Sequence, residues 1–320
     1  MHSSISNSEI GHSNAKLTRF TIALLSTALA LLIVVEAINV LGFDRISKVE
    51  RRESAQRKAL LSVKDEQAHP PYHMAVLGNS LMLEGLDVEV LADQLKGDAE
   101  PVPYLVLATD YYDWYFALKR LFAEGMRPRY ILLGLSPNQL MSNRTRGEYA
   151  AQYLFQTGDL FEVAQKTHMD ATTASSFMLS HVSKYYGTRQ ITRGYILKEL
   201  LPGVAELLHA TLGVFRDPTV PSDAILTVGA DRLKALNALC NANGAQFMLV
   251  VPPTYQLGAE TIAQAGKDSG VQVFVPVKTG TFDSSYFQAD GFHLNQRGAA
   301  IFSKQLAAEL QDSLQTQPSQ

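Results

Sequence analysis

The chain has 320 residues, a formal net charge of −3 and 46% hydrophobic residues. This length and composition fit one sizeable globular domain with insertions, or two smaller ones. The charges form no lysine- or arginine-rich block, so nothing predicts a nucleic-acid partner. A single cysteine, Cys240, excludes an internal disulfide and has no cysteine partner for a structural zinc site. The sequence therefore predicts neither a metal ion nor a cofactor.

Residues 20–43 form the most apolar stretch, with Glu36 as its only charge. The stretch is long enough to cross the hydrocarbon core of a membrane as a helix. A cleaved signal peptide would have a shorter apolar region followed by a small-residue cleavage site. We therefore expect a tail over 1–19 and a transmembrane anchor over 20–43. Glu36 either reaches the membrane interface, which we favour, or contacts another membrane protein.

The charges that flank this anchor bear on its orientation. Lys16 and Arg19 precede it, whereas six lysine and arginine residues follow it within 44–58. Counted literally, the positive-inside rule places the main domain in the cytoplasm. We prefer the opposite orientation because of a family resemblance described below.

The remainder of the chain alternates between strand-like and helix-like segments. Residues 44–70 are predicted to be a membrane-proximal helix or linker, and 71–315 the main domain. Strands are predicted over 72–78, 103–109, 129–137, 246–253 and 271–277. Helices are predicted over 83–97, 111–125, 223–242, 258–268 and 295–314. Apolar strands separated by amphipathic helices predict an α/β fold, with a parallel sheet covered on both faces.

Residues 138–221 interrupt this alternation. They contain helical segments and no convincing strand, which predicts a helical insertion between the third and fourth strands. Loops that leave the carboxyl ends of the strands surround the site in open α/β sheets. The insertion could therefore form a lid or a partner surface.

Two short segments could carry chemistry. The first, Gly78-Asn79-Ser80, follows the first predicted strand, and the second places Asp290 and His293 just before the last helix. A serine hydroxyl becomes a nucleophile when a histidine can take its proton and a carboxylate orients that histidine. Each segment also has a simpler interpretation. Ser80 could cap a helix, and the other two could be a capping carboxylate and a surface histidine.

Taken together, these segments resemble the blocks of the SGNH (GDSL-like) hydrolases. Gly78-Asn79-Ser80 resembles the Gly-Asp-Ser block of that family, with asparagine in place of aspartate. Asp290-Gly291-Phe292-His293 resembles its Asp-x-x-His block, and "HLNQRG" continues into a closing helix as the family does. The resemblance implies a flavodoxin-like three-layer α/β/α sandwich. It also implies Ser80 as nucleophile, His293 as base and then acid, and Asp290 as orienting carboxylate.

The oxyanion hole departs from the family pattern. In the family it uses the N–H of the nucleophilic serine, a glycine after the second strand and an asparagine after the third. This chain has no glycine after its second predicted strand, so an N–H of Ala108 or Thr109 would have to serve beside that of Ser80. Asn138 follows the third strand, either as a donor or as a turn residue after Pro137. The missing glycine argues against ordinary esterase activity.

An anchored domain with a large insertion resembles a narrower group of proteins. These act on cell-envelope polymers beside a membrane-bound O-acyltransferase, as in exopolysaccharide O-acetylation and D-alanine transfer to teichoic acid. The resemblance implies a bacterial inner-membrane protein with an extracytoplasmic domain, a carbohydrate polymer as substrate and an O-acyltransferase as partner. The expected activity is an esterase or acyltransferase, above all for acetyl esters. One alternative is an inactive scaffold that binds polymer or assembles a synthesis complex, and another is a cytoplasmic enzyme.

Overall fold

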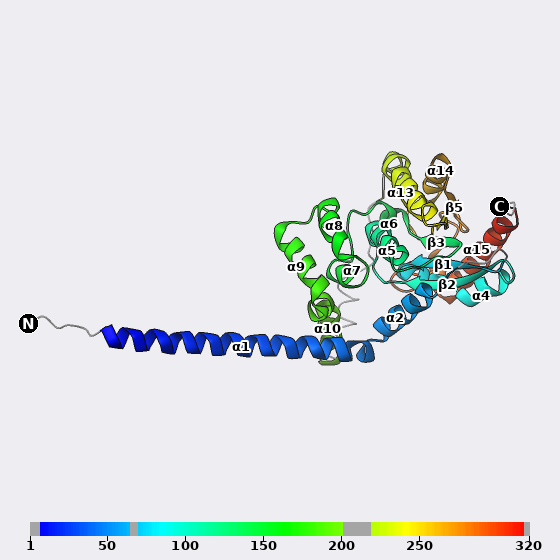
Figure 1. Cartoon of the computed structure of the whole chain (residues 1–320). Helices are drawn as coiled ribbons and strands as arrows, with labels where there is room; N and C mark the ends of the chain where they lie inside the picture. The colour runs from blue at the N-terminus through cyan, green and yellow to red at the C-terminus, as the bar shows by residue number, and fades with distance from the viewer. Residues whose placement is uncertain (1–6, 65–69, 201–218, 317–320) are drawn as a thin grey trace, which may run out of the picture.

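The computed structural model describes residues 7–64, 70–200 and 219–316 (Figure 1). Within these ranges, five strands form one sheet in the order β2-β1-β3-β4-β5, and every neighbouring pair is parallel. The strands are β1 (Tyr72–Gly78), β2 (Ala99–Leu105), β3 (Tyr130–Gly134), β4 (Gln246–Val250) and β5 (Gln272–Phe274). This order is flavodoxin-like, and it confirms the predicted α/β class.

Helices cover both faces of the sheet. On one face lie α5 (Tyr111–Ala123), α13 (Ala230–Asn241) and α14 (Ala259–Ser269). On the other lie α3 (Ser80–Gly85), α4 (Val88–Gln94) and α15 (Gln296–Thr316). Alternate residues of β1 face opposite cores: Leu77 packs in the same cluster as Trp114, and Val76 in the same cluster as Phe302. The three-layer sandwich is therefore confirmed.

Two predicted elements differ most from the structure. The second strand was predicted over 103–109, but β2 runs from Ala99 to Leu105. Pro101 and Pro103 made this strand hard to recognise, because proline argues against a strand in the interior of a sheet. Proline is tolerated here because β2 lies at the edge. The helix predicted over 83–97 is two helices. Asp87 separates them, because its side chain accepts hydrogen bonds from the first backbone N–H groups of α4.

The helical insertion lies between β3 and β4, as predicted. It comprises α6 (Pro137–Met141), α7 (Glu148–Tyr153), the 3-10 turn η1 (Thr157–Asp159), α8 (Leu160–Lys166), α9 (Ala171–Val182) and α10 (Lys184–Leu200). Residues 201–218, which belong to the predicted insertion, lie outside the described residues. The short α12 (Ser222–Ala224) and the π-helical turn η2 (Ile225–Gly229) then lead into α13.

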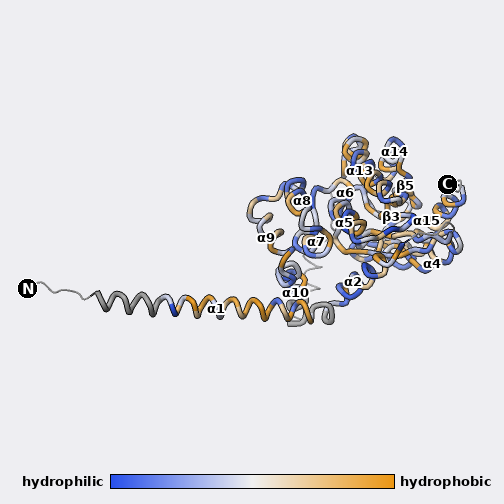
Figure 2. Tube along the Cα trace, in the orientation of Figure 1, coloured by the Kyte–Doolittle hydropathy of each residue, from blue (hydrophilic) through white to orange (hydrophobic). Residues whose placement is uncertain are grey.

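The long N-terminal helix extends away from the sandwich (Figure 1), and the helix after it packs on the sheet. Helix α1 (Asn7–Ile46) contains the segment Thr18–Gly42, with a mean hydropathy of 2.4. Figure 2 shows the apolar stretch along this helix, and its large apolar side chains are exposed. Among the described residues, α1 alone is long and apolar enough to cross a membrane, a property that membrane anchors share with signal sequences. Helix α2 (Lys48–Leu61) follows and packs against β2. The segment predicted to be a helix or linker is thus a docked helix up to Leu61.

Glu36 joins α1 to the insertion. Its carboxylate accepts hydrogen bonds from Ser183 Oγ (2.7 Å), Lys184 N (2.6 Å) and Tyr185 N (3.2 Å). These groups lie at the beginning of α10, so Glu36 supplies the negative charge that a helix N-terminus favours. Neither interpretation made from the sequence included this contact within the chain.

Candidate functional site

Ser80 is the first residue of α3, directly after β1. The cap of this helix is Asn79, whose side-chain oxygen accepts a hydrogen bond from Leu81 N at 3.0 Å. The interpretation of Ser80 as a cap is therefore wrong. Its hydroxyl makes no hydrogen bond within the described part of the chain, and the residue is half-buried. Ser80 thus stands at the carboxyl edge of the sheet with its hydroxyl free.

Close packing at two glycines fixes the beginning of α3. A Cβ atom on Gly78 would lie 2.4 Å from Met82 Cγ, and one on Gly134 would lie 2.2 Å from the same atom. Gly78 and Gly134 are paired at the ends of β1 and β3. Met82 therefore packs directly on the ends of two neighbouring strands, which sets the position of Ser80 two residues before it.

Asp290 and His293 form a pair, as predicted. His293 Nδ1 lies 2.7 Å from Asp290 Oδ2, while Asp290 Oδ1 accepts hydrogen bonds from Phe292 N and His293 N. Burial disfavours the charged carboxylate, but these hydrogen bonds outweigh it and lower the pKa of Asp290 below its ordinary value. His293 Nε2 is buried and has no hydrogen-bond partner in the described residues. This nitrogen is therefore available to exchange a proton.

The simpler interpretation of Asp290 as a helix cap is wrong. Asn295 caps α15, since its side-chain oxygen accepts hydrogen bonds from Arg297 N (3.0 Å) and Gly298 N (3.1 Å). Asp290 instead closes a turn on its own loop and holds the imidazole. The carboxylate thus acts on His293 and not on the helix.

The loop that carries this pair lies against the helix that Ser80 begins. Gln288 Nε2 is 3.4 Å from Glu84 Oε2, and Leu294 Cδ1 lies 3.4 Å from where a Cβ on Gly85 would be. No hydrogen bond joins Ser80 Oγ to His293 Nε2 among the residues the structure describes. Catalytic hydrogen bonds often form only when a substrate binds. The structure therefore joins Asp290 to His293 and places their loop against the helix that Ser80 begins.

The β2–α5 loop adopts the backbone conformation of a glycine at Ala108. Ala108 has φ = 53°, in the left-handed region, and is exposed. Thr109, which is buried, accepts a hydrogen bond through its carbonyl oxygen from Asn79 Nδ2 at 2.9 Å. The side chain that caps the helix of Ser80 therefore also holds this loop. This loop has no glycine, yet Ala108 has the positive φ that glycine adopts most readily.

We expect Ala108→Gly to raise the free energy of unfolding. An alanine in the left-handed region costs about 1–2 kcal/mol, whereas added glycine entropy costs about 0.4–1 kcal/mol, so the net gain is about 0.5–1 kcal/mol. Chemical denaturation measures the gain, with Ala92→Gly inside α4 as a control that loses about 1 kcal/mol. Equal destabilisation by both changes would contradict the strain at Ala108.

Asn138 supplies a second unpartnered donor. It is the second residue of the short helix α6, which Ser136 caps, and not a residue of an open turn after Pro137. Its side-chain nitrogen Nδ2 is buried without a hydrogen-bond partner in the described ranges. Buried donors without partners are rare in folded proteins and call for an explanation. Because β1 and β3 are neighbours, Asn138 and Ser80 both follow strand ends at the same edge of the sheet.

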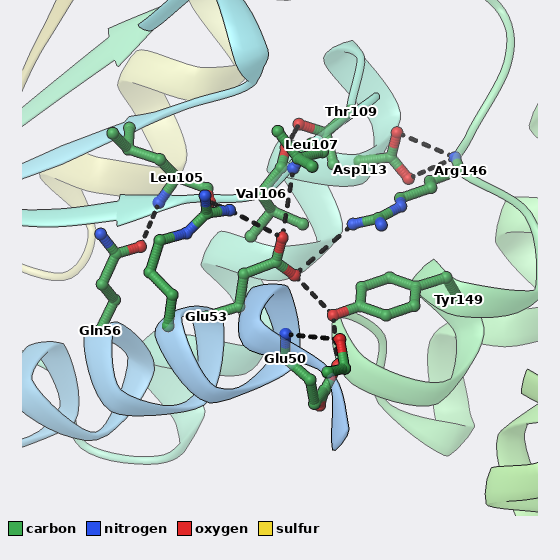
Figure 3. Close-up of polar contacts among 12 residues, drawn as sticks. Glu50, Glu53, Gln56, Leu105, Val106, Leu107, Thr109, Asp113, Arg146 and Tyr149 are labelled. Carbon is green, nitrogen blue, oxygen red and sulfur yellow. Dashed lines mark hydrogen bonds and ion pairs between the residues drawn. The ribbon is translucent and has the colours of Figure 1, made fainter. Parts of the chain in front are cut away.

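A buried cluster of carboxylates behind this edge was not predicted (Figure 3). Tyr149 Oη donates toward Glu50 Oε2 (2.9 Å) and Glu53 Oε2 (2.5 Å), and Glu53 Oε1 accepts a long hydrogen bond from Leu107 N. Arg146 Nη1 lies 3.5 Å from Glu53 Oε2. Helix α2 is therefore tied both to the insertion and to the loop that carries Ala108.

Asp113 belongs to the same region. Both of its carboxylate oxygens accept from Arg146 N, and one accepts from Asp110 N. Burial raises the pKa of Asp113 to about 8, although these N–H groups favour the charged form.

No group of three or more His, Cys, Asp or Glu residues suited to a metal ion is found in the described chain.

No protein-family model matches the sequence, and no curated protein matches it. Several solved structures are similar in fold. The psychrotrophic esterase EstA from Pseudoalteromonas sp. is 14% identical with a TM-score of 0.39, and the match covers 77% of this chain and 100% of that one. An acetylxylan esterase from Geobacillus stearothermophilus is 10% identical with a TM-score of 0.39, over 76% and 95%. A lipase/acylhydrolase from Enterococcus faecalis is 12% identical with a TM-score of 0.35, over 76% and 96%. The fold assignment rests on the strand order itself.

Proposed function

We propose that the protein is a membrane-anchored SGNH-type serine esterase or O-acyltransferase. The observation that carries this proposal is the Asp290–His293 pair, whose free, buried Nε2 lies on a loop packed against the helix that Ser80 begins. A histidine oriented by a carboxylate, on a loop packed against the helix of a serine with a free hydroxyl, supplies the three groups that serine catalysis uses.

In the proposed reaction, Ser80 Oγ attacks the carbonyl carbon of an ester while His293 Nε2 takes the hydroxyl proton. Asp290 stabilises the imidazolium, because its carboxylate stays ionised under the hydrogen bonds that lower its pKa. His293 then returns the proton to the leaving alcohol, which leaves an acyl group on Ser80. Water or a sugar hydroxyl, deprotonated by His293, attacks this acyl group and regenerates the serine. Water completes hydrolysis, and a sugar hydroxyl completes transfer.

The proposed oxyanion hole contains the N–H groups of Ser80 and of Ala108 or Thr109, with Asn138 Nδ2. The left-handed backbone at Ala108 and the unpartnered amide of Asn138 support these roles. Donors held in place before the reaction stabilise the tetrahedral intermediate without further reorganisation.

The proposed substrate is an acyl ester, acetyl above all, of a cell-envelope polysaccharide. The exposed apolar helix α1 supports a membrane location, and we place the domain outside the inner membrane by resemblance to envelope O-acylation proteins. A membrane-bound O-acyltransferase is the proposed partner. A periplasm-active reporter fused to the C-terminus tests the orientation, because a cytoplasmic domain would leave the reporter inactive.

A second candidate function is a polymer-binding or complex-assembling scaffold without catalysis. It is favoured by the lack of a hydrogen bond between Ser80 and His293 among the described residues. The two candidates differ in whether Ser80 reacts with an electrophile.

Labelling with a fluorophosphonate probe separates them. We expect the probe to modify the purified protein, and we expect Ser80→Ala to abolish this modification, because the serine oxygen forms the bond to phosphorus. Ser175→Ala, which removes an exposed serine of α9, is the matched control and should label as the wild type does. A wild-type protein that does not label, or labelling that survives Ser80→Ala, would favour the scaffold.

A further inference from the structure

A cavity of about 520 Å³ opens between the Ala108 loop and the helical insertion. Ala108 forms one side, the segment 145–149 forms another, and α9 and α10 close it. Its volume lies within the range of about 300–1,000 Å³ that is usual for small-molecule sites. The cavity exists only because the insertion is present, so the α/β sandwich alone would not form it.

The cavity adjoins the proposed catalytic edge. Ala108, which lines it, directly precedes Thr109, whose carbonyl oxygen accepts the hydrogen bond from Asn79. Asn79 in turn directly precedes Ser80. A ligand in the cavity would therefore contact the loop that is proposed to stabilise the oxyanion.

The lining combines hydroxyl and amide groups with apolar surface. Thr145, Thr173, Ser176 and Gln190 offer neutral hydrogen-bonding side chains, and Phe177 belongs to the apolar part. Neutral groups that can both donate and accept suit the hydroxyls of a sugar, while the apolar part suits its C–H face. A site for a fatty acyl chain would lack this polar set.

The charged side chains of the lining are already compensated. Arg146 faces Glu53 at 3.5 Å and stacks on Tyr149, with its guanidinium 3.7 Å from the ring centroid. Glu148 accepts a hydrogen bond from Arg189 Nε at 3.0 Å. Because each charge has a partner within the protein, the cavity favours a neutral occupant over a phosphate or another anion.

The wall of the cavity is held from behind. Tyr149 is hydrogen-bonded to Glu50 and Glu53 of α2, and the backbone N–H of Arg146 donates a hydrogen bond to Asp113. A wall that is fixed before binding loses little entropy when a ligand arrives.

We infer that this cavity binds the neutral sugar residue that carries the ester, and so determines the carbohydrate specificity of the enzyme. This inference rests on the proposed function and names where its substrate is recognised. The sugar lies between the insertion and the Ala108 loop, while its acyl group reaches Ser80.

The test fills the cavity from two sides in the full-length protein held in lipid nanodiscs, so that no sugar-based detergent competes. Ser176→Trp on α9 and Gln190→Trp on α10 each place an indole in the cavity. Ser175→Trp adds the same ring at an exposed position of α9 that does not line it, and is the matched control. An acetylated xylo-oligosaccharide serves as the sugar probe and 4-nitrophenyl acetate as the ester without a sugar.

We expect each filling variant to lower the ratio of kcat/KM for the sugar ester over 4-nitrophenyl acetate by about tenfold or more, because the sugar contacts are lost. In a Ser80→Ala background, saturable binding of the oligosaccharide is lost on filling and kept in Ser175→Trp. An unchanged ratio with unchanged binding, or no saturable binding to Ser80→Ala itself, overturns the inference. If binding is lost on filling but the probe does not label Ser80, the proposed catalysis fails and the cavity assignment stands.

Discussion

His293→Ala lowers kcat/KM for an acetyl ester by about 10⁴-fold or more, and Asp290→Asn lowers it by about 10⁴-fold. The first change removes the base that takes the Ser80 proton. The second leaves the imidazole in place but loses the carboxylate that accepts from Nδ1 at 2.7 Å and fixes the tautomer. Steady-state kinetics on 4-nitrophenyl acetate measures both effects.

The matched control for these variants is Asp283→Asn. Asp283 precedes the same loop, is exposed, and accepts a hydrogen bond from Ser285 N at 2.8 Å. We expect this variant to change kcat/KM by less than about threefold, because it alters a turn and leaves the imidazole untouched. Folding is checked by circular dichroism. A folded His293→Ala protein that keeps more than a tenth of the activity would contradict the assigned base.

Glu53→Ala lowers the free energy of unfolding by about 3–5 kcal/mol, which is the usual cost of removing one partner of a buried ion pair. The side chain of Glu53 is 4% exposed, and its loss leaves Arg146 without its facing charge. It also removes an acceptor from Tyr149 Oη and from Leu107 N. Chemical denaturation of the protein in detergent measures the change.

Two comparisons make this second result specific. Glu53→Gln keeps the shape and one acceptor oxygen for Tyr149, and should cost less than the alanine variant. Asp231→Ala breaks the exposed pair with Lys234 and should cost at most about 1 kcal/mol. If Glu53→Ala costs no more than Asp231→Ala, α2 is not held by its buried carboxylates.

The predictability of the fold followed the strength of the local patterns. Buried strands such as β3 and β4 are continuous apolar runs, so their existence could be read from the sequence. The strand β2 was misplaced because it contains prolines, which fit a strand at the edge of a sheet. The sequence alone does not show which strand lies at the edge. The single helix predicted over 83–97 is divided because Asp87 caps a second helix. The periodicity of apolar residues does not show such a cap.

The candidate site divides in the same way. Asp290 and His293 are three residues apart, so one turn can join them, and their spacing predicts the contact. The conformation of Ala108 could not be predicted, since an alanine gives no sign of a positive φ. The burial of Glu50 and Glu53 depends on Tyr149 and Arg146, almost a hundred residues away. Without knowledge of such partners, a charged segment is predicted to lie at the solvent-exposed surface.

The contact of Glu36 with α10 limits how far the proposed enzyme could reach from the membrane. Glu36 lies near the end of the apolar segment Thr18–Gly42, about 9 Å before it at about 1.5 Å per residue. With α1 in the bilayer, this contact holds the beginning of α10 close to the membrane, while α2 is joined to β2. The sandwich is then connected to α1 at two points, which restricts its movement relative to the membrane. Under the proposed function, such an enzyme would reach its polymer only within a fixed distance of the membrane.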